Sequence, residues 1–173
     1  MYTLKDLVTH YVLFFIDIAS RSVHIAGVTP HPDNLWMTQI ARNLTDAEDG
    51  FLRGARYLIL DRDTKYSAEF RHALDREGTH LVRLPPRSPN LNAFAERFVR
   101  SIKSECLNRM IFIGKDSLQH AIGQFMEHYH AERNHQGLEN RLLRPAPVIT
   151  PSQPVRQRQR LGGMLNYYYR AAA

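Results

Sequence analysis

The segment that decides the fold is Pro85-Pro-Arg-Ser-Pro-Asn-Leu-Asn-Ala-Phe-Ala-Glu-Arg-Phe-Val-Arg-Ser-Ile-Lys-Ser-Glu105, which passes from a loop into a helix. Its three prolines exclude a helix from the first half, and the asparagines that follow can cap one. Phe94, Phe98 and Ile102 then recur at intervals that place them on one helical face. The pattern predicts a loop followed by a long helix from about Ala93 to Arg109.

Strand-like runs and helical periods alternate on both sides of this segment. Two runs rich in β-branched and aromatic residues, 11–16 and 22–29, flank a turn and predict a hairpin. Three further helices are expected. The first is capped by Asp33 or Asn34, the second ends at Gly78, and the third extends over about 117–133. Short strands are expected at 56–60 and 80–84. This order predicts an α/β fold with a mixed sheet flanked by helices.

The charge is divided unevenly along the 173 residues. Residues 141–173 hold six of the 23 basic residues and no acid, whereas residues 1–140 hold the other 17 together with all 17 acids. A balanced segment followed by a wholly basic one fits a partner with a phosphate backbone, and fits a solvated tail equally well. We therefore divide the chain into a core, residues 1–140, and a basic extension rich in proline and arginine, residues 141–173.

Composition excludes several classes of protein. Hydrophobic residues make up 43% of the chain, enough for a core, so disorder throughout is excluded. The longest apolar run, 11–16, is strand-sized, so a membrane span is not expected. The N-terminus does not resemble a signal peptide, which predicts a cytoplasmic protein. Cys106 is the single cysteine and cannot form an internal disulfide.

Two carboxylates occupy positions suited to metal chemistry. Asp61 follows an apolar strand directly, where catalytic side chains often project in such sheets. Glu96 lies in the first turns of the predicted long helix. Together they can hold a hard divalent cation, although each alone is more often a capping or first-turn acid. Asp63 is an alternative to Asp61.

Cations follow Glu96 along the same helix. Arg100 and Lys103 lie four and seven residues beyond it, which places all three on one helical face. Such a face suits DNA phosphates held near a metal, and it also makes an ordinary solvated ion-pair surface. In the basic extension, Arg156, Arg158 and Arg160 are further candidates for DNA binding.

Four ordered blocks resemble those of a known family. The segment 85–105 resembles the last catalytic block of the retroviral-type integrase core found in bacterial insertion-sequence transposases. Leu58-Ile-Leu-Asp-Arg-Asp-Thr-Lys-Tyr66 resembles the block before it, and Phe15-Ile-Asp-Ile-Ala-Ser-Arg21 the second strand and its turn. Tyr129-His-Ala-Glu-Arg-Asn-His-Gln-Gly-Leu138 resembles the closing helix motif. The resemblance covers roughly residues 2 to 145.

The resemblance implies an RNase H-like fold, Mg²⁺ or Mn²⁺, and DNA strand transfer without a covalent protein intermediate. It makes Asp61 the second metal-binding aspartate and Glu96 the glutamate of a two-aspartate, one-glutamate polynucleotidyl transferase. Arg100 and Lys103 fall where the family contacts the DNA end.

The resemblance gives the first catalytic aspartate no counterpart. Asp17 matches the turn after the family's second strand, whereas the first aspartate lies on the first strand, a position that would precede Met1. We therefore expect an RNase H-like sheet that lacks most of its first strand, and no activity from this chain. Sequence-specific DNA recognition is not expected either, since the family's upstream helix-turn-helix region has no counterpart.

Other reactive side chains fit structural roles better. His128 and His130 are two apart on a predicted helix and point to different faces, so a metal site with His135 is not favoured. Cys106 fits a buried thiol. The run Tyr167-Tyr-Tyr-Arg170 suits either base stacking or an aromatic anchor for the extension.

Three functions follow from these observations. The first is an enzyme, the core of a DNA transposase or integrase, inactive as this chain. The second is a non-catalytic nucleic-acid-binding remnant, or a regulatory partner of a full-length transposase. The third and weakest is an RNase H-like nuclease. The expected partners are DNA and either a second copy of the chain or a full-length transposase.

Overall fold

The computed structural model describes residues 8–60, 66–85, 92–144 and 154–170. The chain forms two compact units. The first comprises residues 9–15 and 24–96, and the second comprises residues 1–8, 16–23 and 97–173.

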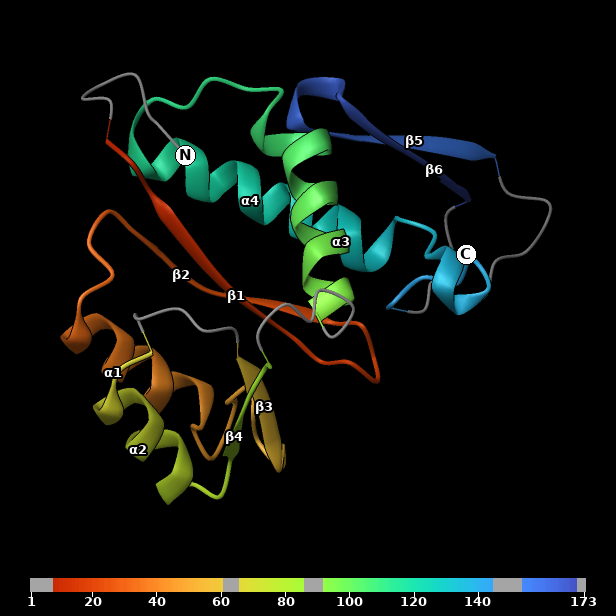
Figure 1. Ribbon diagram of the computed structural model, residues 1–173. Coiled ribbons are helices and arrows are strands. Elements are labelled where there is room, and N and C mark those ends of the chain that lie inside the picture. Colours follow the sequence, from red (N-terminus) through yellow and green to blue (C-terminus); the bar gives the residue numbers. More distant parts are fainter. Residues whose placement is uncertain (1–7, 61–65, 86–91, 145–153, 171–173) are drawn as a thin grey trace. The chain divides into compact units, whose positions relative to one another are not determined.

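The first unit is a layer of strands backed by two helices (Figure 1). Its elements are β1 (Tyr11–Ile16), β2 (Val23–Thr29), α1 (Asn34–Leu44), β3 (Tyr57–Leu60), α2 (Ala68–Arg76) and β4 (His80–Arg83). The turn of the β1–β2 hairpin and the strand residue on each side of it, residues 16–23, belong to the second unit. These bounds agree with the predicted strands and helices to within about a residue. The order of elements is therefore the one that the sequence patterns predicted.

Local capping fixes both helices of this unit. The Asp33 carboxylate accepts a hydrogen bond from the Trp36 N–H at 2.8 Å, and the Ser67 hydroxyl accepts one from the Phe70 N–H at 3.2 Å. Beyond α2, Gly78 has a φ of 80°, in the left-handed region where glycine is favoured. Asp33 and Ser67 thus each accept a hydrogen bond from one of the N–H groups that the start of a helix leaves without a backbone partner.

The two helices and the strands share one apolar core. Its buried residues come from β1, α1, β3 and α2 and from the loop between α1 and β3: Phe15, Met37, Ile40, Ala41, Leu44, Leu52, Leu60, Phe70 and Leu74. Burial of this apolar surface is the main term that stabilises the unit.

The four strands of this unit form two separate two-stranded sheets, the hairpin β1–β2 and the pair β3–β4. The turn between β1 and β2 is closed by a hydrogen bond from the Asp17 N–H to the Ser22 carbonyl at 2.9 Å. β3 and β4 are parallel, with Tyr57 opposite His80 and Leu60 opposite Arg83. Among the described residues no ladder joins the two pairs, so the predicted mixed sheet is present as two strand pairs on one core.

The second unit is built mainly from helices (Figure 1). Helix α3 (Ala93–Ile102) begins in the first unit and passes into the second, where a π-helical turn, η2 (Lys103–Leu107), continues it. The remaining elements are α4 (Gly114–Ala131), η3 (Gln136–Leu138), β5 (Val155–Arg160), η4 (Leu161–Gly163) and β6 (Leu165–Arg170). The long helix predicted over 93–109 is thus α-helical only as far as Ile102.

Aromatic rings pack α3 onto α4. The Phe98 ring lies 5.3 Å from the Tyr129 ring and 6.3 Å from the Phe125 ring, centroid to centroid. Phe98 and Phe125 are both buried. This packing confirms the predicted apolar face of the long helix at Phe98 and Ile102.

The basic extension contains a regular hairpin, which its composition did not predict. β5 and β6 are antiparallel, with Val155 opposite Arg170 and Arg160 opposite Leu165. Leu161 and Leu165 are buried, and the Leu161 N–H donates to the Gln124 side-chain oxygen of α4 at 2.6 Å. The hairpin is therefore held on α4 by a few contacts that lie far apart in the sequence.

Within the described ranges, no helix is long and apolar enough to cross a membrane.

Candidate functional site

Glu96 is the one predicted metal-binding carboxylate that the described residues include. It is exposed on the first turn of α3, where it can offer a hard oxygen ligand to a cation. Asp61 and its alternative Asp63 lie outside the described residues. In the described part of the chain no group of three His, Cys, Asp or Glu side chains is placed to hold a metal ion.

Asp17 serves the hairpin turn between β1 and β2. Its carboxylate Oδ1 accepts hydrogen bonds from the Ala19 N–H at 2.7 Å and the Ser20 N–H at 2.9 Å. This is the local pattern by which aspartate stabilises a turn. The structure thus gives Asp17 a structural role in the turn that the sequence predicted.

Arg100 and Lys103 are exposed beyond Glu96. Glu96 and Arg100 are four residues apart in the α-helical part of α3, and so lie one turn apart. Lys103 is the first residue of the π-helical turn. Arg100 and Lys103 are both accessible to solvent and to an anionic partner.

Two of the three β5 arginines predicted to bind DNA hold the extension to α4. The Arg160 guanidinium donates to the Glu132 carboxylate at 2.7 and 2.9 Å, and Arg158 donates to it at 3.1 Å. The His128 Nδ1 lies 3.1 Å from the same carboxylate. The Glu132 side chain is only 1% exposed, so a single buried carboxylate contacts two arginines and a histidine.

These partners control the ionisation of Glu132. Burial would raise its pKa, but hydrogen bonds from Arg160, Arg158 and His128 outweigh burial and lower the pKa to about 2. The carboxylate is therefore charged at neutral pH. A buried charge is tolerated only when it is paired in this way, so Glu132 fixes where the hairpin docks.

The side chains of the hairpin divide between its two faces. Arg158 and Arg160 share one face with Tyr167 and Tyr169, whose rings stack at 5.8 Å. The Arg158 guanidinium lies 4.9 Å from the Tyr169 ring centroid. Arg156 is on the same face but is exposed. The anchoring role predicted for the tyrosine run thus fits Tyr167 and Tyr169, whereas Tyr168 is 64% exposed.

A second ion pair joins two of the motif blocks. The Glu105 carboxylate is hydrogen-bonded to Arg133, whose guanidinium lies 5.8 Å from the Tyr129 ring centroid. The His135 Nε2 donates to the Tyr129 carbonyl at 2.8 Å. The end of the 85–105 block and the 129–138 block are therefore adjacent, and their polar residues support the fold around Tyr129.

The predicted structural roles of the remaining reactive side chains agree with the structure. His130 is buried, and its Nε2 accepts a hydrogen bond from the Val23 N–H at 3.1 Å. Cys106 is fully buried, its Sγ lies 3.8 Å from the Ala121 carbonyl, and burial raises the pKa of the thiol to about 11. A thiol in this environment is a poor nucleophile.

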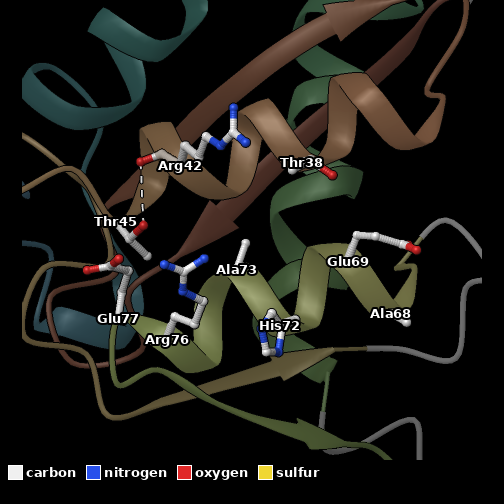
Figure 2. Close-up of a pocket in the computed structure, with 9 residues that line it drawn as sticks. All are labelled: Thr38, Arg42, Thr45, Ala68, Glu69, His72, Ala73, Arg76 and Glu77. Carbon is white, nitrogen blue, oxygen red and sulfur yellow. Dashed lines mark hydrogen bonds between the residues drawn. The ribbon is translucent and has the colours of Figure 1, made fainter.

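A groove of about 660 Å³ lies between α1 and α2 (Figure 2). Its lining carries charges of both signs and none of the predicted site residues: Thr38, Arg42, Thr45, Ala68, Glu69, His72, Ala73, Arg76 and Glu77. Two arginines and two glutamates line the groove, so their formal charges balance.

Part of the chain matches the model of a known protein family. Residues 77–142 match the family model described as an integrase core domain. The match includes Glu96, Arg100, Lys103 and the 129–138 motif. It confirms the resemblance to the integrase catalytic core that the motif blocks indicated. No curated protein matches the chain.

A solved structure supports the fold. The chain is similar to one in the cryoEM structure of the simian T-cell lymphotropic virus intasome in complex with PP2A regulatory subunit B56 gamma, with 14% identity and a TM-score of 0.50. The match covers 94% of this chain and 65% of that one. The chain thus spans just under two thirds of the length of this structural relative, and its RNase H-like fold is confirmed.

Glu132 is the polar residue that the sequence analysis missed. One signal was available, since an extension with six arginines and no acid needs a carboxylate elsewhere if it is to dock. Glu132 lies within the 129–138 motif, but nothing local distinguishes it from other acids of the core.

Proposed function

We propose that this chain is the core of a protein that integrates or transposes DNA, with residues 1–140 as catalytic core and residues 141–173 as basic extension. The integrase core match over residues 77–142 is the observation that carries this proposal. In this function the chain works on DNA in the cytoplasm, together with a second copy of itself or a full-length transposase.

The proposed site assigns distinct tasks to the residues on α3. Glu96 supplies one carboxylate to a divalent metal and Asp61 supplies the other. Mg²⁺ or Mn²⁺ held by these carboxylates would supply activation of an attacking oxygen and charge stabilisation of the departing oxygen of a phosphodiester. Arg100 and Lys103 hold the phosphates of the DNA beside the carboxylates. The exposure of Arg100 on α3 and of Lys103 at the start of η2 supports this role.

The DNA-binding part of the proposal is tested by fluorescence anisotropy of the full chain with a labelled duplex at several salt concentrations. We expect Arg100→Gln/Lys103→Gln to weaken binding uniformly across sequences and to lower the salt slope by about 0.9 for each phosphate that is no longer neutralised. Arg158 and Arg160 both donate to Glu132, so among the three arginines of β5 we expect Arg156→Gln to have the largest effect. Unchanged affinity in both variants would contradict these assignments.

The metal-binding part is tested by calorimetry with Mn²⁺ on the full chain. We expect weak binding, because two carboxylates leave a metal short of protein ligands. Asp61→Asn and Glu96→Gln should each remove it, whereas Asp17→Asn should not, because Asp17 is engaged in its turn. Binding that persists in Asp61→Asn would remove Asp61 from the site.

The catalytic part concerns strand transfer. We propose that this chain alone joins no DNA ends with Mg²⁺ or Mn²⁺, and that the addition of an upstream strand carrying an aspartate restores joining. A third carboxylate must be held close to the other two, and catalysis falls steeply with small misplacements. The assay is the joining of labelled duplex ends to a plasmid. Joining by the chain as given, lost in Asp17→Asn, would make Asp17, Asp61 and Glu96 the catalytic set.

A non-catalytic role shares the same DNA contacts. A chain that binds DNA and associates with a full-length transposase, yet joins no ends in either form, would act as a regulatory partner. Co-sedimentation with a full-length transposase, together with the joining assay, separates the two functions.

A further inference from the structure

The β5–β6 hairpin is attached to the second unit through one face only. Glu132 pairs with Arg158 and Arg160, and Leu165 is buried on that same face. In β6 burial alternates strictly, so every second residue points to the other side of the hairpin. The hairpin is therefore a ribbon with one docked face and one exposed face.

The outward face of the hairpin is polar and exposed. Cross-strand pairing places six exposed residues on it: Val155, Gln157, Gln159, Asn166, Tyr168 and Arg170. Three of them carry amide groups, one a phenol and one a guanidinium. None carries a carboxylate, and residues 141–173 contain no acid at all. The face therefore has no acidic group that would repel DNA phosphates, and it is rich in groups that both donate and accept hydrogen bonds.

Hydrogen bonds within the outward face hold its side chains in place. The Gln157 Nε2 donates to the Asn166 Oδ1 at 2.8 Å and to the Tyr168 hydroxyl at 3.2 Å. The Asn166 Nδ2 donates to the Gly163 carbonyl at 2.9 Å. Side chains held in this way lose less conformational entropy when they bind a partner.

We infer that the outward face of the β5–β6 hairpin recognises base edges in the major groove of duplex DNA. This inference rests on the proposed function, that the chain binds DNA, and adds sequence preference to it. It departs from the expectation, drawn from the sequence, that this chain alone has no sequence-specific recognition.

The dimensions and chemistry of the hairpin fit this role. Two strands of six residues make a ribbon about 20 Å long with strands about 5 Å apart, and the major groove, about 12 Å wide, admits a two-stranded ribbon. Glutamine and asparagine are the side chains that pair with adenine there. Arg156 and Arg170, exposed at the open end of the hairpin, are placed to meet the phosphates that flank the groove.

The test selects a preferred duplex from a random library with the full chain, and then compares the affinities for the selected and the shuffled duplex by anisotropy. We expect the wild-type chain to prefer the selected duplex by about tenfold or more. In the double variant Gln157→Ala/Asn166→Ala the ratio of the two affinities should fall to within about twofold. The salt dependence of the affinity should stay unchanged, because no charge is removed. Gln159→Ala, which removes none of the named hydrogen bonds, should also lower the ratio.

The chain offers a matched control. On α1 the Gln39 Nε2 donates to the Asn43 Oδ1 at 2.8 Å, so this exposed pair has the same residue types and the same hydrogen-bond length as Gln157 and Asn166. Gln39→Ala/Asn43→Ala should keep the wild-type preference. DNA binding without any sequence preference, or a preference that survives in the hairpin variants, would overturn the inference alone.

Two other outcomes have different meanings. A wild-type chain that binds no duplex DNA would overturn the proposed function and this inference with it. Hairpin variants that change the sedimenting mass of the chain but not its DNA preference would identify the outward face as a protein interface, which also overturns the inference.

Discussion

Among single side chains, Glu132 makes the strongest link between distant parts of the sequence. We predict that Glu132→Gln lowers the free energy of unfolding by about 2 kcal/mol, because it removes a buried charge that compensates two arginines. The loss is below that of a fully buried pair, since the Arg158 side chain is 47% exposed and can return to water. Urea denaturation measures the difference.

Glu127 provides the control for this substitution. Its carboxylate lies 3.6 Å from Arg144, and both side chains are more than half exposed. Exposed pairs contribute little, so Glu127→Gln should cost well under about 1 kcal/mol. Equal losses in the two variants would show that Glu132 stabilises the chain no more than a surface acid does.

Cys106 gives a second prediction about a single side chain. The thiol is fully buried and its pKa is raised to about 11, so little thiolate forms at pH 8. We expect no reaction with a disulfide reagent such as DTNB in the folded protein, and complete reaction in 6–8 M urea (a concentration of the order that unfolds small domains). Rapid reaction of the folded protein would show that the contact between η2 and α4 opens readily.

At the level of secondary structure, two glycines of α4 should respond to alanine in opposite directions. Gly114, the first residue of α4, has a φ of 78°, whereas Gly123 lies exposed inside the helix. No heavy atom lies within 4 Å of a Cβ added at either position. Gly123→Ala should therefore stabilise the protein by up to about 1 kcal/mol, and Gly114→Ala should destabilise it by about 1 kcal/mol. Thermal denaturation measures both, and shifts of the same sign would contradict the prediction.

The elements that the sequence predicted well are those fixed by nearby residues. Asp33 caps α1 three residues from the amide it accepts, and Ser67 caps α2 in the same way. The β5–β6 hairpin was not predicted, because its contacts with Glu132 and Gln124 span 26 to 37 residues. The π-helical turn after Ile102 was also missed, since the apolar spacing there is compatible with a continuous α-helix.

In the candidate site, too, local sequence patterns located some residues, whereas contacts between distant residues could not be predicted. The motif blocks located Glu96, Arg100 and Lys103, which all lie within the integrase core match. Charge alone could not distinguish Arg156 from Arg158 and Arg160, because the distinction depends on one buried carboxylate in another element. Composition identified a basic segment, and tertiary contacts decide which of its charges face solvent.

For the whole molecule, three histidines couple folding to pH. His24 stacks on the Phe51 ring at 5.1 Å, His130 accepts a hydrogen bond from Val23, and His135 packs against Tyr129. Burial lowers the pKa of all three below the ordinary value of 6.5, and for His130 the nearby Arg144 lowers it further. The folded state therefore holds these rings neutral under conditions in which the unfolded chain protonates them.

The sign of the pH dependence follows from these shifts. Below pH 6.5 the unfolded chain binds more protons than the folded one, so stability is fully present above 6.5 and is lost as the pH falls through the lowered values. Glu132, with a pKa of about 2, loses its contribution only at lower pH. We expect urea midpoints that are constant between about pH 7.5 and 8 and that fall as the pH is lowered below 6.5. His130→Gln should make that fall shallower, because one titrating ring is removed. A midpoint that rises on acidification over this range would show that the histidines gain charge partners on folding and are not held neutral.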